Sequence, residues 1–304
     1  MQEFQLLERV FAHNVSLPAC VVVPPGDDMA ALRLPPQTST ILVAADSAVE
    51  GRHTPVGVDA YILGRKAVLR NLSDVAAMAN ARPFATLACA MIPVGTEEAR
   101  VWRLFEGLRE TALQWNAPLV GGDMTAVSAE SALSVAVTIL ATPIDSSAAL
   151  ATRSSAREGD GVYVTGVLGG AWDRVTGLGR HLDFTPRLNV AQALFAQLGS
   201  RLHAMIDVSD GLMQDLGHIA KRSAHTLEIE LARVPIENGW APMDAIAHGE
   251  DYELAFTATG EVPAQLAGVP ITRIGTVRAG DGIVQLLDGA RTVTVSRPGW
   301  EHGT

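Results

Sequence analysis

The sequence predicts an α/β or α+β protein of two domains, and three observations favour this fold class. The chain has 304 residues, which is more than one average domain. Hydrophobic residues make up 48% of it and charged residues 18%, enough to form sizeable cores. Strand-like and helix-like segments mix in both halves, and residues 142–160, rich in Ser, Ala, Pro and Asp, form the best candidate for a junction. We therefore expect domains over residues 1–143 and 144–304.

In the N-terminal half, the apolar periodicity predicts both helices and strands. Asp59 and Thr96 are suited to cap two of the helices. Residues 40–45 are apolar throughout, which favours a central strand. We expect helices over residues 3–11, from Asp59 to about residue 80 and from Thr96 to about residue 115, and strands over residues 19–23, 40–45, 84–92 and 133–139.

In the C-terminal half, short apolar runs are separated by Gly, Pro and acidic residues, a pattern typical of strands with turns. There is no short-period repeat. We expect strands over residues 161–165, 204–208, 227–231, 254–257, 271–277 and 283–287, and helices over residues 186–203 and 210–223.

Composition narrows the function classes. The net charge of −10 argues against nucleic acid as the main partner, because phosphate backbones are bound through a surplus of Lys and Arg. Lys66 and Lys221 are the only lysines, and no Walker motif or G-x-G-x-x-G occurs. Cys20 and Cys89 form neither a disulfide framework nor a zinc motif. With no signal peptide and no apolar run long enough to span a bilayer, we expect a cytoplasmic protein.

Acidic residues recur where apolar or small-residue stretches end or break. A carboxylate costs several kcal/mol to bury unpaired, and two of them about 4 Å apart repel by roughly 4 kcal/mol at an effective dielectric near 20. If these positions converge they need a cation, and oxygen-rich sites suit Mg²⁺, which usually bridges to substrate phosphates. The positions are Asp27, Asp28, Asp46, Asp74, Asp123, Asp207, Asp210, Glu250 and Asp251.

Most of these positions also have a plain structural explanation. Asp27, Asp28 and Asp46 could be turn formers, Asp74 could lie on a helix surface, and residues 248–253 could form a solvated loop. Ser209 and Asp210 could cap a helix. Residues 207–212 give the strongest local signal, because the apolar Met205-Ile206 would otherwise carry Asp207 into a buried position without a reason.

Taken in order, the motifs resemble the thiamine-monophosphate kinase family over essentially the whole chain. They are Gly-Asp-Asp (26–28), Asp-Ser-x-Val-Glu-Gly-x-His (46–53), Asn-Leu-Ser-Asp-x-Ala-Ala-Met (71–78), Gly-Gly-Asp (121–123), Ile-Asp-x-Ser-Asp-Gly-Leu-x-x-Asp-Leu (206–216) and Gly-Glu-Asp-Tyr-Glu-Leu (249–254). The resemblance implies an aminoimidazole ribonucleotide synthetase-like fold: an N-terminal mixed sheet with helices, which binds ATP and Mg²⁺ and forms a homodimer, and a C-terminal α/β domain that completes the active site.

The resemblance also implies ATP-dependent phosphorylation of thiamine monophosphate to thiamine diphosphate, with several Mg²⁺ ions and no general base. Asp207 and Asp210 would be the most critical residues. By motif, the metal ligands would be Asp28, Asp46, Asp74, Asp123, Asp207 and Asp210, with Asp27 close by. Gly122, Asp123, Arg153 and Ser209 would contact ATP. His53, Glu250 and Trp300 would line the thiamine phosphate pocket, where an aromatic face suits a cationic thiazolium.

Some positions depart from the family pattern. Ala44 and Ala45 stand where a hydroxyl residue often precedes the aspartate, Thr54 replaces an aromatic residue, and His248 occupies a usual glycine position. Met29 and Met124 stand in normally smaller or more polar places. Two other functions therefore stay open: a related ATP-dependent enzyme that acts on another small substrate, and a nucleotide-binding regulator that has lost turnover.

Overall fold

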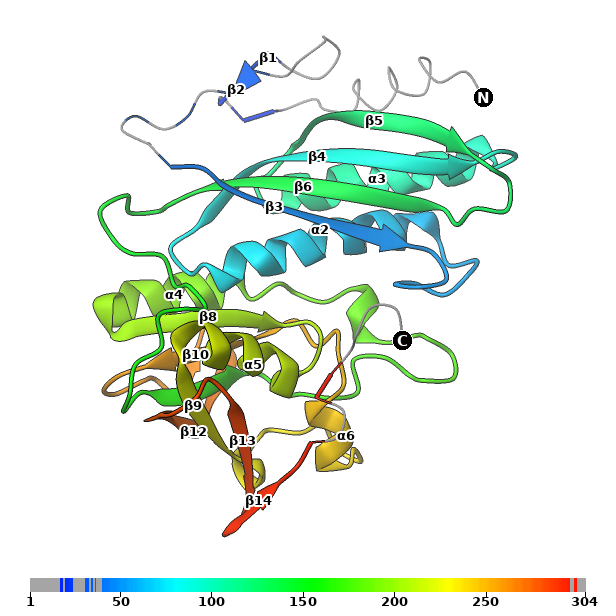
Figure 1. Ribbon diagram of the computed structural model, residues 1–304. Coiled ribbons are helices and arrows are strands. Elements are labelled where there is room, and N and C mark those ends of the chain that lie inside the picture. Colours follow the sequence, from blue (N-terminus) through cyan, green and yellow to red (C-terminus); the bar gives the residue numbers. More distant parts are fainter. Residues whose placement is uncertain are drawn as a thin grey trace.

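Two sheets and a long helix between them form the body of the protein in this computed structural model (Figure 1). The structure describes residues 17–18, 20–23, 31–32, 34, 36, 40–295 and 298–299. The helix expected over residues 3–11 lies outside the described residues. Near the start of the described chain, β1 (Val21–Val23) pairs with β2 (Ala31–Leu32), which confirms the core of the strand expected over residues 19–23.

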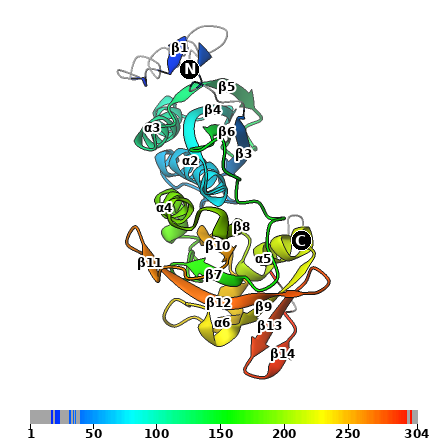
Figure 2. The same ribbon diagram turned by 90° about the vertical axis from the view of Figure 1, so that its left-hand side faces the viewer.

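The first large sheet has four strands in the order β3-β6-β4-β5. Only β4 and β5 are parallel, so the sheet is mixed, as expected. Helices α2 and α3 cover one face of it (Figure 2). The bounds are β3 (Leu42–Val49), α2 (Ala60–Ala77), β4 (Arg82–Pro93), α3 (Glu98–Gln114), β5 (Leu119–Val127) and β6 (Ser134–Thr142).

Strand β3 corrects one expectation. It lies at the edge of this sheet and not at its centre, and it continues through Asp46 to Val49. Its residues alternate in exposure, so that Val43 is 63% exposed on the face away from the helices. A run of apolar residues does not by itself require burial on both faces, and here alternate side chains lie on the open face.

Two short motifs also sit differently from the expectation. Thr96 does not cap α3; its hydroxyl donates to Pro93 O, and Glu97 is the N-cap without a side-chain hydrogen bond. Gly121-Gly122-Asp123 lies inside β5 and not after a strand. A Cβ on Gly122 would lie 1.8 Å from Ala88 O on β4, so close strand packing requires the glycine.

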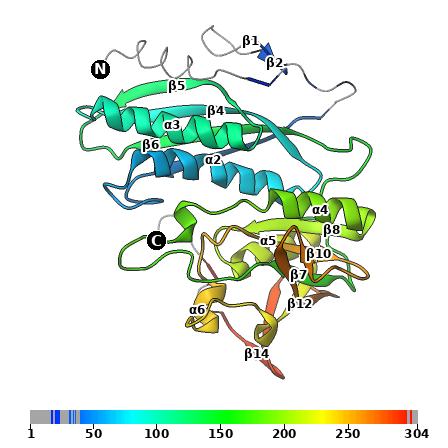
Figure 3. The ribbon, with the colours of Figure 1, turned by 180° about the vertical axis from the view of Figure 1, so that it is seen from behind.

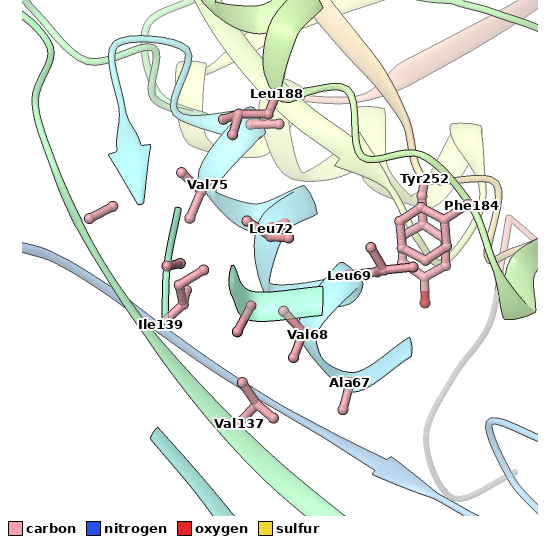
Figure 4. Close-up of a cluster of buried hydrophobic side chains, with 14 of the residues drawn as sticks. Ala67, Val68, Leu69, Leu72, Val75, Val137, Ile139, Phe184, Leu188 and Tyr252 are labelled. Atoms are coloured by element: carbon pink, nitrogen blue, oxygen red, sulfur yellow. The ribbon is translucent and has the colours of Figure 1, made fainter. Parts of the chain in front are cut away.

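Helix α2 is the central element of the fold. Asp59 caps it, as expected, by accepting a hydrogen bond from Tyr61 N at 3.0 Å. The helix is buried on most of its surface because it lies between the first sheet and the C-terminal half. Figure 4 shows the resulting continuous core, with Val137 and Ile139 on one side of α2 and Phe184, Leu188 and Tyr252 on the other. The helix therefore connects the two halves.

The second large sheet contains the remaining strands in the order β14-β13-β9-β12-β7-β10-β8, with β11 paired to β12 (Figure 2; Figure 3 shows the same half from behind). All six strands expected here are present within a few residues. The bounds are β7 (Gly161–Thr165), β8 (Leu202–Val208), β9 (His225–Glu230), β10 (Glu253–Ala258), β11 (Gln265–Leu266), β12 (Val269–Ala279), β13 (Val284–Asp288) and β14 (Arg291–Val293).

The helices of this half are shorter than expected. The helix expected over 186–203 ends at Leu198, and a 3₁₀ turn leads into β8. The helix expected from Asp210 begins at Leu212, because Gly211 has φ +125° and interrupts the helical backbone. The bounds are α4 (Leu188–Leu198), α5 (Leu212–Ser223) and α6 (Pro242–Ile246), with 3₁₀ helices η1 (Arg180–Leu182), η2 (Gly199–Arg201) and η3 (Leu231–Arg233).

No helix or strand interrupts residues 143–160, which connect β6 to β7. No strand pairing among the described residues joins the two large sheets, although the core runs through both halves. The division into domains 1–143 and 144–304 stays a prediction. Within the described ranges, no helix has the length and hydropathy needed to cross a membrane.

Candidate functional site

Three acidic side chains from separate segments meet beside α2. Asp46 comes from β3, Asp74 from α2 and Asp207 from β8. Ser73 Oγ donates a hydrogen bond to Asp207 Oδ2 at 2.8 Å. Asp207 is only 4% exposed, so this neighbourhood provides little water to solvate its charge.

The pKa values show that these acids interact. Burial, followed by the charges of Asp207 and Asp46, raises the pKa of Asp74 to about 8. Burial also raises the pKa of Asp207, against the hydrogen bond from Ser73 and the charge of Arg153. The three carboxylates therefore have too little positive charge around them, a deficit that a bound cation would correct. Among the described residues, no three His, Cys, Asp or Glu side chains converge tightly enough to form a metal site by themselves.

A cavity of about 700 Å³ opens beside the acidic centre. Its size is within the range of small-molecule sites. Asp74 lies in its wall, so a ligand in the cavity would reach the acidic centre. Its apolar lining includes Leu42, Ala44, Met78, Ile139 and Met205, and its polar lining includes Thr152, Arg153, Ser154 and Arg222. An apolar lining that also includes two arginines suits a flat base carrying phosphates.

The turn after β8 presents Ser209 and Asp210 next to the acidic centre. Asp215 Oδ2 accepts hydrogen bonds from the backbone N–H groups of Ser209, Asp210 and Gly211 at 3.0, 3.1 and 3.1 Å. Asp215 is 2% exposed, and burial raises its pKa well above the ordinary value, with Asp207 and Asp210 adding to the effect. Asp215 thus holds Ser209 and Asp210 in position. It belongs to the motif at residues 206–216, but the sequence alone did not indicate this role.

The segment around Glu250 packs directly against this turn. Glu250 N donates to Ser209 O at 2.7 Å and Tyr252 N donates to Val208 O at 2.8 Å. Glu250 and Tyr252 have φ values of +66° and +52°, which side-chain-bearing residues rarely adopt. Tyr252 is held in place by stacking on Phe184, with ring centroids 3.9 Å apart. The acidic motif and the Glu250 motif therefore form one structural unit.

A buried polar cluster surrounds the Glu250 carboxylate. Lys66 Nζ, which is fully buried, lies 2.8 Å from Glu250 Oε1 and 2.6 Å from His53 O. His181 Nδ1 lies 2.6 Å from both Lys66 Nζ and Glu250 Oε2. A neutral His181 would accept a hydrogen bond from Lys66, and a protonated one would donate to Glu250. The cluster joins three loops around one lysine of α2.

The cluster keeps Glu250 ionised. Burial opposes its charge, but the hydrogen bond with His181 and the charge of Lys66 outweigh burial and lower the pKa of Glu250 to about 2. Burial lowers the pKa of Lys66 to about 8, with Glu250 opposing that shift. Burial and then Arg70 lower the pKa of His53 to about 4, so its imidazole is neutral near pH 7, with Nδ1 accepting from Val49 N. The result is a fixed carboxylate beside a neutral imidazole.

Comparisons with known proteins show the family to which the chain belongs. A family model described as "AIR synthase related protein, N-terminal domain" matches residues 26–142. The chain is 31% identical to the thiamine-monophosphate kinase of Haemophilus influenzae, over 99% of this chain and 98% of that protein. It belongs to the thiamine-monophosphate kinase family.

Solved structures of thiamine-monophosphate kinases share the fold. The enzyme from Stenotrophomonas maltophilia superposes with a TM-score of 0.79 at 31% identity, covering 96% of this chain and 98% of that one. A structure described as "AaThiL complexed with AMPPCP and TMP" superposes with a TM-score of 0.72 at 26% identity, covering 86% of this chain and 87% of that one. The expected fold class is confirmed.

Most of the site residues expected from the thiamine-monophosphate kinase motifs fall into three groups. Asp46, Asp74, Asp207, Asp210 and Ser209 gather around the acidic centre, while Arg153 reaches it from the cavity. His53 and Glu250 lie together at the Lys66 cluster, about two helical turns away along α2. Asp27, Asp28 and Trp300, like Met29, lie outside the described residues.

Asp123 lies apart from the acidic centre in this single chain. The register aligns Asp46 with Val137, Ala88 and Gly122 across the sheet, on the face that α2 covers. Since alternate residues of a strand point to opposite faces, Asp123 lies on the open face. Its carboxylate accepts a hydrogen bond from Thr125 at 3.2 Å.

Two departures from the family pattern have clear local surroundings. His248 is 3% exposed and lies between the rings of Trp172 and Trp240, with centroids 5.1 and 4.5 Å away. Burial, then the charge of Arg174, lowers the pKa of His248 to about 4, so the neutral ring fills this space. Thr54 is buried, and its hydroxyl has no partner among the described residues.

Proposed function

We propose that this chain transfers the γ-phosphoryl group of ATP to thiamine monophosphate, which yields thiamine diphosphate. One observation carries the proposal. Helix α2 presents Asp74 and Ser73 to the acidic centre and, about two turns earlier, Lys66 to the Glu250 cluster. Eight residues of α-helix span about 12 Å, which suits two ligands that meet phosphate to phosphate. Membership of the kinase family supports the same reaction.

The nucleotide would lie in the cavity beside α2. Its apolar wall, including Leu42 and Met205, would hold the base, and Arg153 would contact the phosphates. The turn at Ser209, held by Asp215, would place a hydroxyl and backbone groups near the same phosphates. This arrangement would place the γ-phosphate near Asp74, facing the acceptor site along α2.

The acceptor would bind at the other end of α2. The Glu250 carboxylate, kept ionised by Lys66 and His181, suits the cationic ring of thiamine monophosphate. The neutral His53 would offer a hydrogen bond without adding charge. The attacking phosphate oxygen is already anionic near neutral pH, so no side chain needs to take a proton, and positioning plus electrostatic stabilisation would supply the rate enhancement.

The proposal includes Mg²⁺. Asp46, Asp74, Asp207 and Asp210 would hold the ions, because their oxygen-only donor set fits a hard divalent cation. The raised pKa values of Asp74 and Asp207 support a cation at this place. When bound, Mg²⁺ neutralises the charge that develops on the transferring phosphoryl group. Asp123, Asp27 and Asp28 would complete the set predicted from the family motifs.

The proposal also includes a homodimer formed through the open face of the N-terminal sheet. Ile41 and Val43, 46% and 63% exposed, lie at the β3 edge, while Asp123 lies on the open face of β5. A second copy on this face would bury the apolar residues and would bring further carboxylates toward the site. In size-exclusion chromatography with light scattering, Val43→Glu should yield monomers, whereas Ile283→Glu on the C-terminal half should stay dimeric. Dimers in both variants would exclude this face.

Release of ADP with a panel of acceptors tests the activity. Thiamine monophosphate should give the highest kcat/KM, and turnover should require Mg²⁺. Asp207→Asn should reduce kcat by at least about 100-fold while the protein stays folded, and Asp288→Asn, at the exposed end of β13, should have no effect. Preference for another acceptor would indicate a related enzyme of the same fold. ATP binding without turnover on any acceptor would indicate a regulator.

A further inference from the structure

Arg70 occupies the middle of the active face of α2. It lies four residues after Lys66 and four before Asp74, so the three side chains share one face at spacings of about one turn. Its Nη1 donates to Ser47 O at 2.8 Å and its Nη2 to Asp46 Oδ1 at 3.3 Å. Burial opposes its charge, but Tyr252, Asp46, Glu250 and Asp74 together raise its pKa. Arg70 is therefore a permanent cation between the acidic centre and the Glu250 cluster.

Not every hydrogen-bond donor of the Arg70 guanidinium has an acceptor among the described residues. Its Nε is buried and has no hydrogen-bond partner among the described residues. The contact with Asp46 is a single hydrogen bond of 3.3 Å, not the short bidentate pair that Arg and a carboxylate form when the pair is structural. A buried donor without an acceptor is costly, which indicates that an acceptor atom arrives with a ligand.

The two neighbouring cations, Lys66 and Arg153, lie away from the space beside Arg70. Lys66 is fully buried and bonded to Glu250 and His53 O, while Arg153 lies at the cavity next to Asp74. An acceptor phosphate that approaches the ATP phosphates from the Glu250 side would carry its negative charge into the space beside Arg70. Arginine suits that task, because its planar donors match phosphate oxygens in pairs.

We propose that Arg70 is a catalytic residue that binds the phosphate group of the acceptor and holds it for attack. This inference rests on the proposed function. Two phosphate groups repel each other and need positive charge to come together. Arg70 would supply part of that charge, from a position between the residues that bind ATP and those that bind the thiamine ring. Arg70→Met should therefore weaken the binding of ligands that carry the phosphate much more than the binding of ligands that lack it.

Calorimetric binding of thiamine monophosphate and of thiamine, in the presence of Mg²⁺ and AMPPCP, tests this. Wild type should bind the phosphate ester more tightly than thiamine. Arg70→Met should lose at least about tenfold in affinity for the ester and less than threefold for thiamine. Its kcat should fall about 100-fold or more. Arg65→Met, on the same helix but paired with the exposed Asp183, should match wild type in all these measurements.

Several results would overturn the inference. Equal affinity loss for both ligands, or none for either, would make Arg70 a structural residue. If Arg70→Met does not fold, Arg70→Lys decides the question, because it keeps the charge but not the paired donors. The Lys variant should lose at least threefold in affinity for the ester only, and an unchanged affinity would contradict the proposal. A wild type that neither binds nor phosphorylates thiamine monophosphate would instead refute the proposed function, and the inference with it.

Discussion

Ser73 and Asp207 are joined by a hydrogen bond of 2.8 Å between a hydroxyl on α2 and a carboxylate on β8. Both residues are nearly inaccessible, at 1% and 4% exposure. The contact links α2 of the N-terminal half to the edge strand β8 of the C-terminal half. It therefore fixes how the two halves of the acidic centre meet.

Ser73→Ala tests the importance of that contact. The change leaves the buried Asp207 carboxylate without its hydroxyl donor, which should lower the free energy of unfolding by about 1–2 kcal/mol. Because Asp207 would lose its fixed orientation, kcat should fall about tenfold or more. Urea unfolding and steady-state kinetics measure the two effects, and Ser147→Ala in an exposed turn serves as the control. Activity equal to wild type would show that Asp207 is held by other contacts.

Lys66→Met should be strongly destabilising, because it leaves Glu250 charged and largely buried without its cation. A loss of about 3 kcal/mol in the free energy of unfolding is expected. The double variant Lys66→Met/Glu250→Gln removes both charges and should recover a large part of that loss. Chemical denaturation of the four proteins in the cycle measures the coupling energy between the two residues. Additive effects would mean that the 2.8 Å contact carries no net interaction.

Asp215 should matter as an acceptor and not as a charge. Asp215→Ala removes the partner of three backbone N–H groups and should cost about 3 kcal/mol of stability together with most of the activity. Asp215→Asn keeps an acceptor oxygen and should retain the fold with a cost below about 1 kcal/mol. Thermal unfolding and kcat of the two variants separate the possibilities. Equal behaviour of both variants would contradict the role given to these hydrogen bonds.

Acid should weaken the Glu250 cluster. The folded-state pKa of Glu250 is lowered from 4.5 to about 2, so its contribution is present above pH 4.5 and is lost as the pH falls toward 2. The full shift corresponds to at most about 3 kcal/mol. The difference in unfolding free energy between wild type and Glu250→Gln should therefore shrink between about pH 5 and pH 2. A difference that stays constant over this range would show that Glu250 titrates normally.

Much of the fold follows from local sequence patterns. Asp59 caps α2, and the apolar residues of α3 and the alternation in β6 appear where the periodicity predicts them. Strand β3 lies at the sheet edge and not at the predicted centre, because a strand with one open face can be as apolar as a buried one, as the exposed Val43 shows. The Thr96 hydroxyl could have capped α3, but it bonds back to Pro93 O in the preceding turn.

The candidate site was predictable in its acids but not in its supporting residues. Asp46, Asp74 and Asp207 are conspicuous because carboxylates next to apolar runs need an explanation. Lys66 and Arg70 gave no such signal, since a basic residue in a helix is usually at the surface. Their partners come from segments far away in the chain, such as His181 and Glu250, and only the tertiary structure brings them to α2.

The central claim is that α2 aligns a nucleotide–metal site with an acceptor site. A crystal structure of the protein with AMPPCP, Mg²⁺ and thiamine monophosphate tests it most directly. We expect the nucleotide in the cavity beside Asp74, its terminal phosphate group at Asp207, and the acceptor between Arg70 and Glu250 with its phosphate pointing at the nucleotide. Ligands bound on surfaces that α2 does not connect would contradict it.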